Sequence, residues 1–206
     1  KPTLTNMCEN IAKITLKNPA RAINEGYSGK YGTPAPVDLF SMINEYVAIA
    51  GRGGMKELQV EVIKMCLGGI KKYQKCMEEG IVELEEPADQ LILLCAIIND
   101  CDEIADNLDS NIEDQYEDLL EEFDIEKEMD AVRVQCQTLS RYATGTIKNV
   151  IFKDLEELEE TLFDLESWKQ QEYLEACVST IDDYLGDFMD RIVDMSYLTL
   201  VGFCFS

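Results

Sequence analysis

The chain has 206 residues, of which 46% are hydrophobic and 29% are charged, a composition typical of a folded globular protein rather than a disordered one. Its formal net charge is −23, which disfavours binding to nucleic acid or to anionic lipid. Histidine, the commonest general base and metal ligand, is absent. We therefore expect a protein that binds other proteins, with no catalysis, no cofactor and no bound metal.

The acidic residues are distributed unevenly along the chain. Residues 1–76 contain 11 basic and 6 acidic residues, whereas residues 77–206 contain 7 basic and 35 acidic residues. A solvated outer helix surface explains most of this charge, and a docking surface for a basic partner protein is the functional alternative. We name the candidate protein-interaction residues the acidic face: Glu113, Asp114, Glu117, Asp118, Glu121 and Glu122.

Several features of the sequence bear on the cellular compartment. The eight cysteines show no C-x-x-C pair or zinc-ligand spacing, and they are expected to be reduced core residues. No Asn-x-Ser/Thr acceptor and no signal peptide are present. No window reaches the roughly 18 uninterrupted apolar residues of a membrane span, so direct membrane insertion is not expected. We expect a cytoplasmic protein.

Apolar residues recur at spacings of three and four, without sustained alternation of period two, which predicts an all-α fold. The first helix is expected over 3–17, ending before Pro19. A Gly/Pro-rich connector follows at 24–36. The next helix, from about Val37 to the glycines at 51–54, carries an apolar stripe formed by Val37, Phe40, Ile43, Tyr46, Val47 and Ala50.

The pattern resumes over 55–79, with Leu58, Val62, Met65, Cys66, Ile70, Tyr73 and Met77 facing inward. Gly68 and Gly69 interrupt this helix, and we expect them to allow a close helix crossing. Pro87 is expected at the first position of the most apolar helix. Its inward residues are Leu91, Leu94, Cys95, Ile98, Cys101, Ile104 and Leu108.

Three further long helices are expected, over 112–144, 147–165 and 168–206. Long helices with apolar stripes and short polar breaks predict antiparallel, stacked helical bundles that form a rod. The expected organisation is an N-terminal helix at 1–23 that continues from a preceding region, the connector at 24–36, and a bundle at 37–206 that is truncated at its C-terminus. The chain is thus expected to be part of a longer protein.

One motif raises an enzymatic alternative. Asp182, Asp183 and Asp187 resemble the D-D-x-x-D motif with which all-helical terpene synthases hold magnesium for prenyl-diphosphate chemistry, but the third aspartate is one residue late. Residues 99–103 (NDCDE) faintly resemble the second metal motif of these enzymes, without its Ser/Thr and later Glu, and precede the first motif. The simpler interpretation of both segments is solvated acids on helix faces.

Two other ligand motifs fail on spacing. An EF-hand loop beginning at Asp109 would place Asp114 where glycine is required and Leu120 where the bidentate glutamate is required. The glycines at 26–32 lack the spacing and the preceding strand of a phosphate-binding loop. We interpret 26–32 as an ordinary connector.

The order of four segments carries a family resemblance. They are 34–45 (PAPVDLFSMINE), 94–101 (LCAIINDC), 151–155 (IFKDL) and 180–188 (TIDDYLGDF). Together they resemble the exocyst complex component 3 family over about residues 26–205. No single motif is strong, and the shared order carries the likeness.

The resemblance implies a rod of stacked helical bundles within the exocyst, which tethers secretory vesicles to the plasma membrane before SNARE-mediated fusion. It implies no catalytic residues, a peripheral location at plasma-membrane sites of exocytosis, and other exocyst subunits as partners, with SNARE proteins as further candidates. Under it, Asp182, Asp183 and Asp187 cap or decorate a helix. The residues that it places in bundle cores are Val37, Phe40, Leu94, Ile98 and Tyr184.

Overall fold

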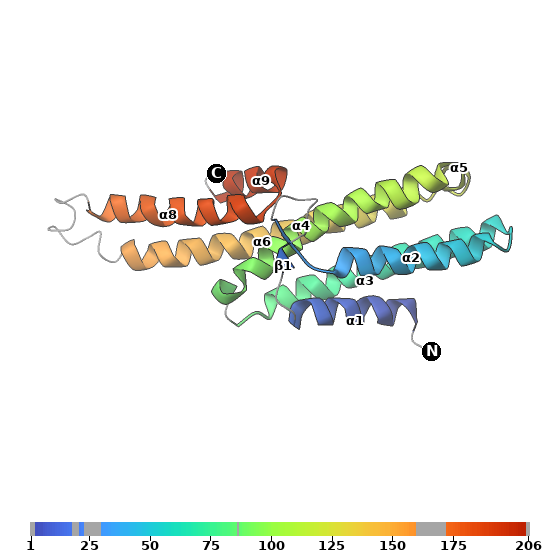
Figure 1. The fold of residues 1–206 in the computed structure, drawn as a ribbon, viewed down its shortest axis with the longest axis horizontal. Coiled ribbons are helices and arrows are strands. Elements are labelled where there is room, and N and C mark those ends of the chain that lie inside the picture. Colours follow the sequence, from blue (N-terminus) through green and yellow to red (C-terminus); the bar gives the residue numbers. More distant parts are fainter. Residues whose placement is uncertain (1–2, 18–20, 23–29, 86, 160–171, 205–206) are drawn as a thin grey trace.

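The computed structural model describes residues 3–17, 21–22, 30–85, 87–159 and 172–204. These residues form an elongated arrangement of long helices (Figure 1), and the all-α prediction is confirmed. The α-helices are α1 (Leu4–Lys17), α2 (Ala35–Gly51), α3 (Lys56–Val82), α4 (Leu91–Leu108), α5 (Asp114–Glu122), α6 (Glu126–Glu159), α8 (Glu172–Arg191) and α9 (Asp194–Cys204). A 3-10 turn, η1 (Pro87–Gln90), precedes α4, and a π-helical turn, η2 (Asp109–Glu113), follows it.

A small antiparallel pairing departs from the expected absence of sheet. Strands β1 (Arg21–Ala22) and β2 (Tyr31–Gly32) pair, with Arg21 opposite Gly32 and Ala22 opposite Tyr31. Two residues are too few to produce a period-two pattern in the sequence. Of the predicted connector at 24–36, residues 24–29 lie outside the described residues, Tyr31–Gly32 form β2, and α2 begins at Ala35.

Helix α4 lies at the centre of the molecule and contacts α6, α2, α8 and β2 (Figure 1). All residues from 93 to 101 are buried, because neighbouring elements surround this part of the helix. The predicted core positions Phe40, Leu94 and Ile98 are confirmed as buried, and Tyr184 packs partly buried against the core. The most apolar predicted helix is therefore the core helix.

Some predicted inward positions are wrong. Val37 is 63% exposed, and Tyr46, Leu58 and Met65 are exposed as well. The buried side of α2 is centred on Leu39, Ile43 and Val47, and so does not include Val37. Because α2 and α3 each leave one side in solvent, an apolar residue beside the buried side stays exposed at little cost.

The crossing of α1 and α3 depends on Gly69. A Cβ atom at Gly69 would lie 2.8 Å from the Sγ of Cys8, whereas a Cβ at Gly68 would meet nothing within 4 Å. A Cβ at Gly80 would lie 2.2 Å from a methyl carbon of Leu16. The expected close crossing is thus confirmed at Gly69, and Gly68 has no part in it.

The predicted helix over 112–144 is broken in its middle and does not end near Thr144. Helix α5 ends at Glu122 and α6 begins at Glu126, with Asp124 in the left-handed region at a φ of 50°. An aspartate tolerates this conformation better than most residues, so no glycine marks the turn. The expected break near Thr144 does not occur. Helix α6 is continuous there, and Thr144 donates its hydroxyl hydrogen to the carbonyl of Ser140 (2.8 Å).

The helix predicted from Trp168 to the end is also divided. Its first residues, 168–171, lie outside the described residues, and Ile192 and Val193 separate α8 from α9. Helix α9 turns back beside α8 and also contacts α6 (Figure 1). Neither glycine nor proline marks this break in the sequence.

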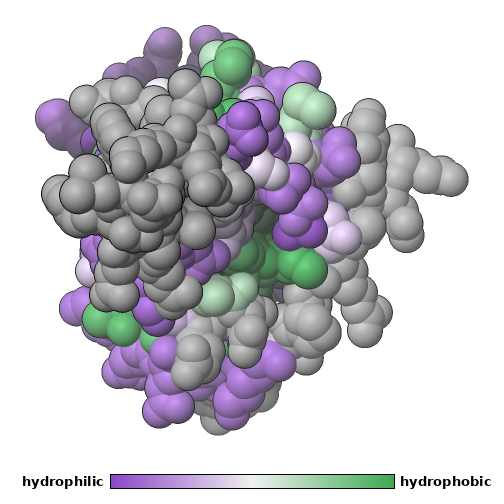
Figure 2. Space-filling view, turned by 90° about the vertical axis from the view of Figure 1, so that its left-hand side faces the viewer, coloured by the Kyte–Doolittle hydropathy of each residue, from purple (hydrophilic) through white to green (hydrophobic). Residues whose placement is uncertain are grey.

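Among the described residues visible at the left-hand end of Figure 1, hydrophilic residues predominate and hydrophobic residues gather near the centre (Figure 2). Large apolar side chains are also exposed on α9, where Met195 is 74% and Leu198 is 62% exposed. Apolar side chains are therefore interspersed among hydrophilic ones on this part of the surface.

Candidate functional site: the acidic face around α5

The acidic face lies on two consecutive elements, η2 and α5. Glu113 ends η2, the other five residues belong to α5, and all six are exposed. Helix α5 buries Leu119 and Leu120 against the core, which leaves its remaining positions in solvent. The sequence prediction that these acids occupy an outer surface agrees with this placement.

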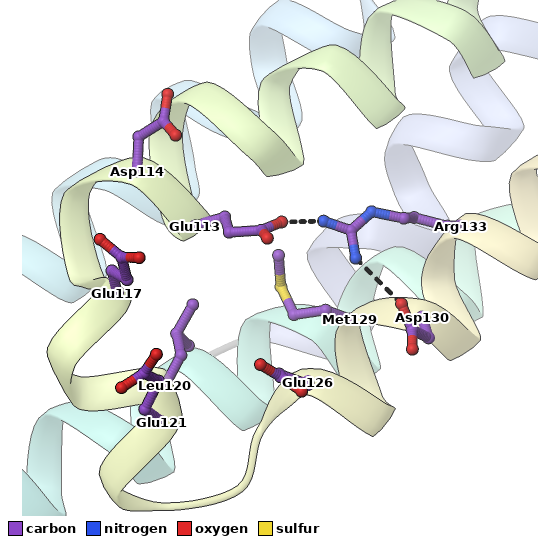
Figure 3. Close-up of a pocket in the computed structure, with 9 residues that line it drawn as sticks. All are labelled: Glu113, Asp114, Glu117, Leu120, Glu121, Glu126, Met129, Asp130 and Arg133. Atoms are coloured by element: carbon purple, nitrogen blue, oxygen red, sulfur yellow. Dashed lines mark hydrogen bonds and ion pairs between the residues drawn. The ribbon is translucent and has the colours of Figure 1, made fainter.

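A shallow groove of ≈ 250 Å³ runs between the acidic face, on η2 and α5, and the start of α6. The groove is lined by Glu113, Asp114, Glu117, Leu120, Glu121, Glu126, Met129, Asp130 and Arg133. Figure 3 shows Leu120 and Met129 between the carboxylates of the two helices. The groove therefore combines a strongly negative rim with two apolar side chains.

Arg133 neutralises part of this charge. Its Nη2 donates to the Oδ1 of Asp109 (2.6 Å) and to Glu113, and its Nη1 donates to the Oδ1 of Asp130 (3.1 Å), as Figure 3 shows for the latter two. Three carboxylates around one guanidinium leave a net negative charge at this point. Arg133 therefore fixes η2 against α6 without cancelling the acidity of the surface.

Two members of the acidic face are paired and four are not. Glu113 pairs with Arg133, and Glu122 pairs with the Nζ of Lys56 (2.6 Å). Within the described part of the chain, no ion pair involves the other four: Asp114, Glu117, Asp118 and Glu121. These four carboxylates carry the uncompensated charge.

A second groove of ≈ 330 Å³ lies on the side of α5 that faces α3. It is lined by Lys56, Gln59, Asp114, Gln115, Tyr116, Glu117, Asp118 and Leu119. Asp114 and Glu117 line both grooves, so they lie on the ridge between them. Both residues are exposed, so a second protein could reach them from either groove.

The aspartates on α8 lie apart from the core. Asp182, Asp183 and Asp187 are all exposed, and Asp187 pairs with the Nη2 of Arg191 at 2.9 Å. Among the residues that the structure describes, no group of three or more acids and cysteines is arranged to hold a metal ion. The arrangement is that of acids on a helix surface.

The segment 99–103 differs from the expectation of solvated acids. Asn99 and Asp100 are buried, at 3% and 1% exposed. The carboxylate of Asp100 accepts hydrogen bonds from Thr33, and burial raises the pKa of Asp100 to about 7. Asp102 accepts a hydrogen bond from the hydroxyl of Ser196 at 2.6 Å. The expectation of solvated side chains is wrong for Asn99 and Asp100, because both lie within the most apolar helix, where neighbouring elements bury them and supply their hydrogen-bond partners.

The cysteines are all free thiols. Burial raises the pKa of Cys8 to about 11, and the pKa values of Cys66 and Cys95 to about 12. Desolvation by burial is the main cause at all three. At neutral pH these thiols are protonated and poor nucleophiles.

None of the described helices combines the length and apolar character needed to cross a membrane.

Comparison with known proteins identifies the family. The family model of exocyst complex component Sec6 matches residues 4–203. The chain belongs to the Sec6 family. The resemblance to an exocyst component, which rested on the order of four segments, is thereby confirmed at the level of the family.

A solved structure shares the fold of this Sec6-family chain. The crystal structure of the C-terminal domain of the exocyst subunit Sec6p superimposes with a TM-score of 0.84 at 17% sequence identity. The match covers 98% of this chain and 57% of that domain, and at this identity it establishes the fold alone. A comparison with curated proteins finds no match.

Proposed function

We propose that this chain is a non-catalytic segment of an exocyst subunit of the component 3 type, which tethers secretory vesicles to the plasma membrane before SNARE-mediated fusion. The Sec6 family match over residues 4–203 is the observation that carries the proposal. The elongated helical bundle supports it, because long helices offer extended surfaces for other subunits without a substrate pocket.

The chain acts in the cytoplasm, peripherally at plasma-membrane sites of exocytosis. Its partners are other exocyst subunits, and SNARE proteins are further candidates. The net charge of −23 supports protein partners over nucleic acid or anionic lipid, because both of these carry negative charge. Contact with the membrane is then indirect, through the assembled complex.

The acidic face is the surface that we propose for a basic partner. Four of its carboxylates lack ion pairs within the described residues, and two grooves with apolar side chains flank them. Complementary charge accelerates association and fixes orientation, while the buried apolar contacts supply affinity. Leu120 and Met129 are the apolar residues in the first groove.

The magnesium-dependent diphosphate enzyme is not supported. Asp182, Asp183 and Asp187 are exposed, and Arg191 already pairs with Asp187. Such an enzyme needs its carboxylates to converge on one enclosed point. The family match likewise favours a tethering subunit.

Affinity purification of the tagged chain from cell extract, followed by mass spectrometry, tests the proposal. Recovery of the other exocyst subunits is expected, and the same preparation is assayed for prenyl-diphosphate turnover with magnesium. Absence of every exocyst subunit, or magnesium-dependent turnover that is lost in Asp183→Asn, would refute it.

A further inference from the structure

The break between α8 and α9 has no cause in its own residues. It consists of Ile192 and Val193, flanked by Arg191 and Asp194, and contains neither proline nor glycine. Kinks in helices arise at proline, at glycine or serine pairs, at π-bulges, or where a side chain enters the backbone hydrogen-bond ladder. Only the last of these causes fits this break.

The donor side of the broken ladder is taken by Asn99. In a continuous helix the N–H of Val193 would donate to the carbonyl of Met189, four residues earlier. Instead it donates to the Oδ1 of Asn99 on α4, at 2.9 Å. The ladder is intact on both sides, because Ile192 donates to Phe188 (2.9 Å) and Tyr197 donates to Val193 (2.8 Å).

The acceptor side is taken by two side chains. The carbonyl of Met189, which Val193 would have used, accepts a hydrogen bond from the Nζ of Lys30. The carbonyl of Arg191 accepts one from the Nδ2 of Asn99 at 2.8 Å. Lys30 is only 14% exposed, and its Nζ lies 3.6 Å from the Oδ1 of Asp194, the first residue of α9.

Both N–H groups of the Asn99 amide donate hydrogen bonds, and its oxygen accepts one. Its Nδ2 also donates to the carbonyl of Tyr31 at 2.7 Å, so one buried side chain joins β2, the end of α8 and the start of α9. A buried polar group that lost such partners would carry the full cost of desolvation. Asn99 therefore favours the bent arrangement over any other at this position.

The bend places α9 on the bundle. Leu200 and Cys204 are 0% and 5% exposed, and the Nζ of Lys148 on α6 donates to the carbonyl of Phe203 at 2.8 Å. A continuous helix would carry these residues onward along the axis of α8, whereas α9 turns back beside α8. The docking of α9 and the bend at 192–193 are thus coupled.

We propose that Asn99 and Lys30 form a clasp that imposes the break, and that without it α8 and α9 join into one helix from Glu172 to Cys204. The clasp is a conformational device, because the residues at the break include no proline or glycine that would impose it. Release of the clasp exchanges a docked α9 for an undocked one while the rest of the core stays folded.

The rate at which Cys204 reacts with a thiol reagent reports the position of α9, since this thiol is buried only while α9 is docked. Asn99→Leu and, separately, Lys30→Met are expected to raise the rate at Cys204 by at least about tenfold, with Cys66 and Cys101 unchanged. Mass spectrometry of the digested protein assigns each modified cysteine. Far-UV circular dichroism is expected to show undiminished helix content.

Two control variants make the same amino-acid replacements, Asn to Leu and Lys to Met, at positions outside the clasp. Asn107→Leu removes an amide on the same helix that donates to Glu103 within α4 (2.8 Å), and Lys75→Met removes an exposed lysine paired with Glu79 (3.8 Å). Both are expected to leave the reaction of Cys204 unchanged. An unchanged Cys204 rate in both clasp variants, a loss of helix content, or equal exposure of Cys66 and Cys101 would overturn the proposal.

Discussion

The carboxylate of Asp100 on α4 accepts two hydrogen bonds from Thr33, which lies 67 residues earlier: one from its backbone N–H (3.0 Å) and one from its hydroxyl (2.5 Å). The hydroxyl oxygen of Thr33 in turn accepts a hydrogen bond from the N–H of Ala35, the first residue of α2, at 3.2 Å. The start of α2 is therefore fixed to the centre of the bundle through one buried acid.

The first prediction concerns pH. Burial raises the pKa of Asp100 from 3.8 to about 7, so the folded state binds this proton more tightly than the unfolded state does. The stability contribution of Asp100 is therefore greatest below pH 4 and is lost as pH rises to 7. We expect Asp100→Asn to gain up to about 2 kcal/mol in unfolding free energy, relative to the parent, between pH 5 and pH 7.

Urea denaturation at several pH values measures this difference. Asp182→Asn, which changes an exposed acid, is the control. A difference between Asp100→Asn and the parent that does not change with pH would show that Asp100 does not titrate in this window.

The second prediction compares adjacent glycines in α3. Gly68→Ala adds a methyl group in open space and should stabilise the protein by about 0.5–1 kcal/mol, because alanine restricts the unfolded chain and favours helix. Gly69→Ala should destabilise it by about 1–3 kcal/mol, because its Cβ would lie 2.8 Å from the Sγ of Cys8. Thermal denaturation of both variants checks the opposite signs, and equal shifts would contradict the close packing of α1 on α3.

The third prediction concerns the core helix. Leu94→Asp and Ile98→Asp should each unfold or aggregate the protein, because both positions are almost fully buried and an unpaired buried charge is expensive. Val37→Asp, at a position 63% exposed, should change the unfolding free energy by less than about 0.5 kcal/mol. Parent-like melting of either α4 variant would refute the placement of α4 at the centre.

The sequence was sufficient for the helical class and for most residues of the core, because apolar spacing reports which side of each helix is buried. It was not sufficient to show that Val37 is exposed, since periodicity cannot show how far the neighbouring helices extend over α2. The break at Val193 was also missed, because its causes, Asn99 and Lys30, lie far away in the chain. The acidic face could be predicted as exposed, but its division into paired and unpaired carboxylates required the positions of Arg133 and Lys56.

The fourth prediction concerns the aspartates of α8. Changing Asp182, Asp183 and Asp187 together to asparagine should leave the melting temperature nearly unchanged, because the pair of Asp187 with Arg191 is exposed and worth about 0.3–0.5 kcal/mol. Removing the repulsion between Asp183 and Asp187 offsets part of that loss. Isothermal titration with magnesium should give no micromolar binding to the parent, and binding that the triple variant abolishes would favour the enzyme.

The central claim is that the chain works through protein contacts made by the acidic face. Its most direct test measures the recovery of other exocyst subunits by the parent and by a variant in which Asp114, Glu117, Asp118 and Glu121 are replaced by asparagine or glutamine. We expect the variant to fold normally and to recover at least about tenfold less partner at low salt. The triple asparagine variant of α8, which removes a similar charge elsewhere, should recover as much partner as the parent. Equal losses in both variants, or no loss in the first, would contradict the assignment of the acidic face as the docking surface.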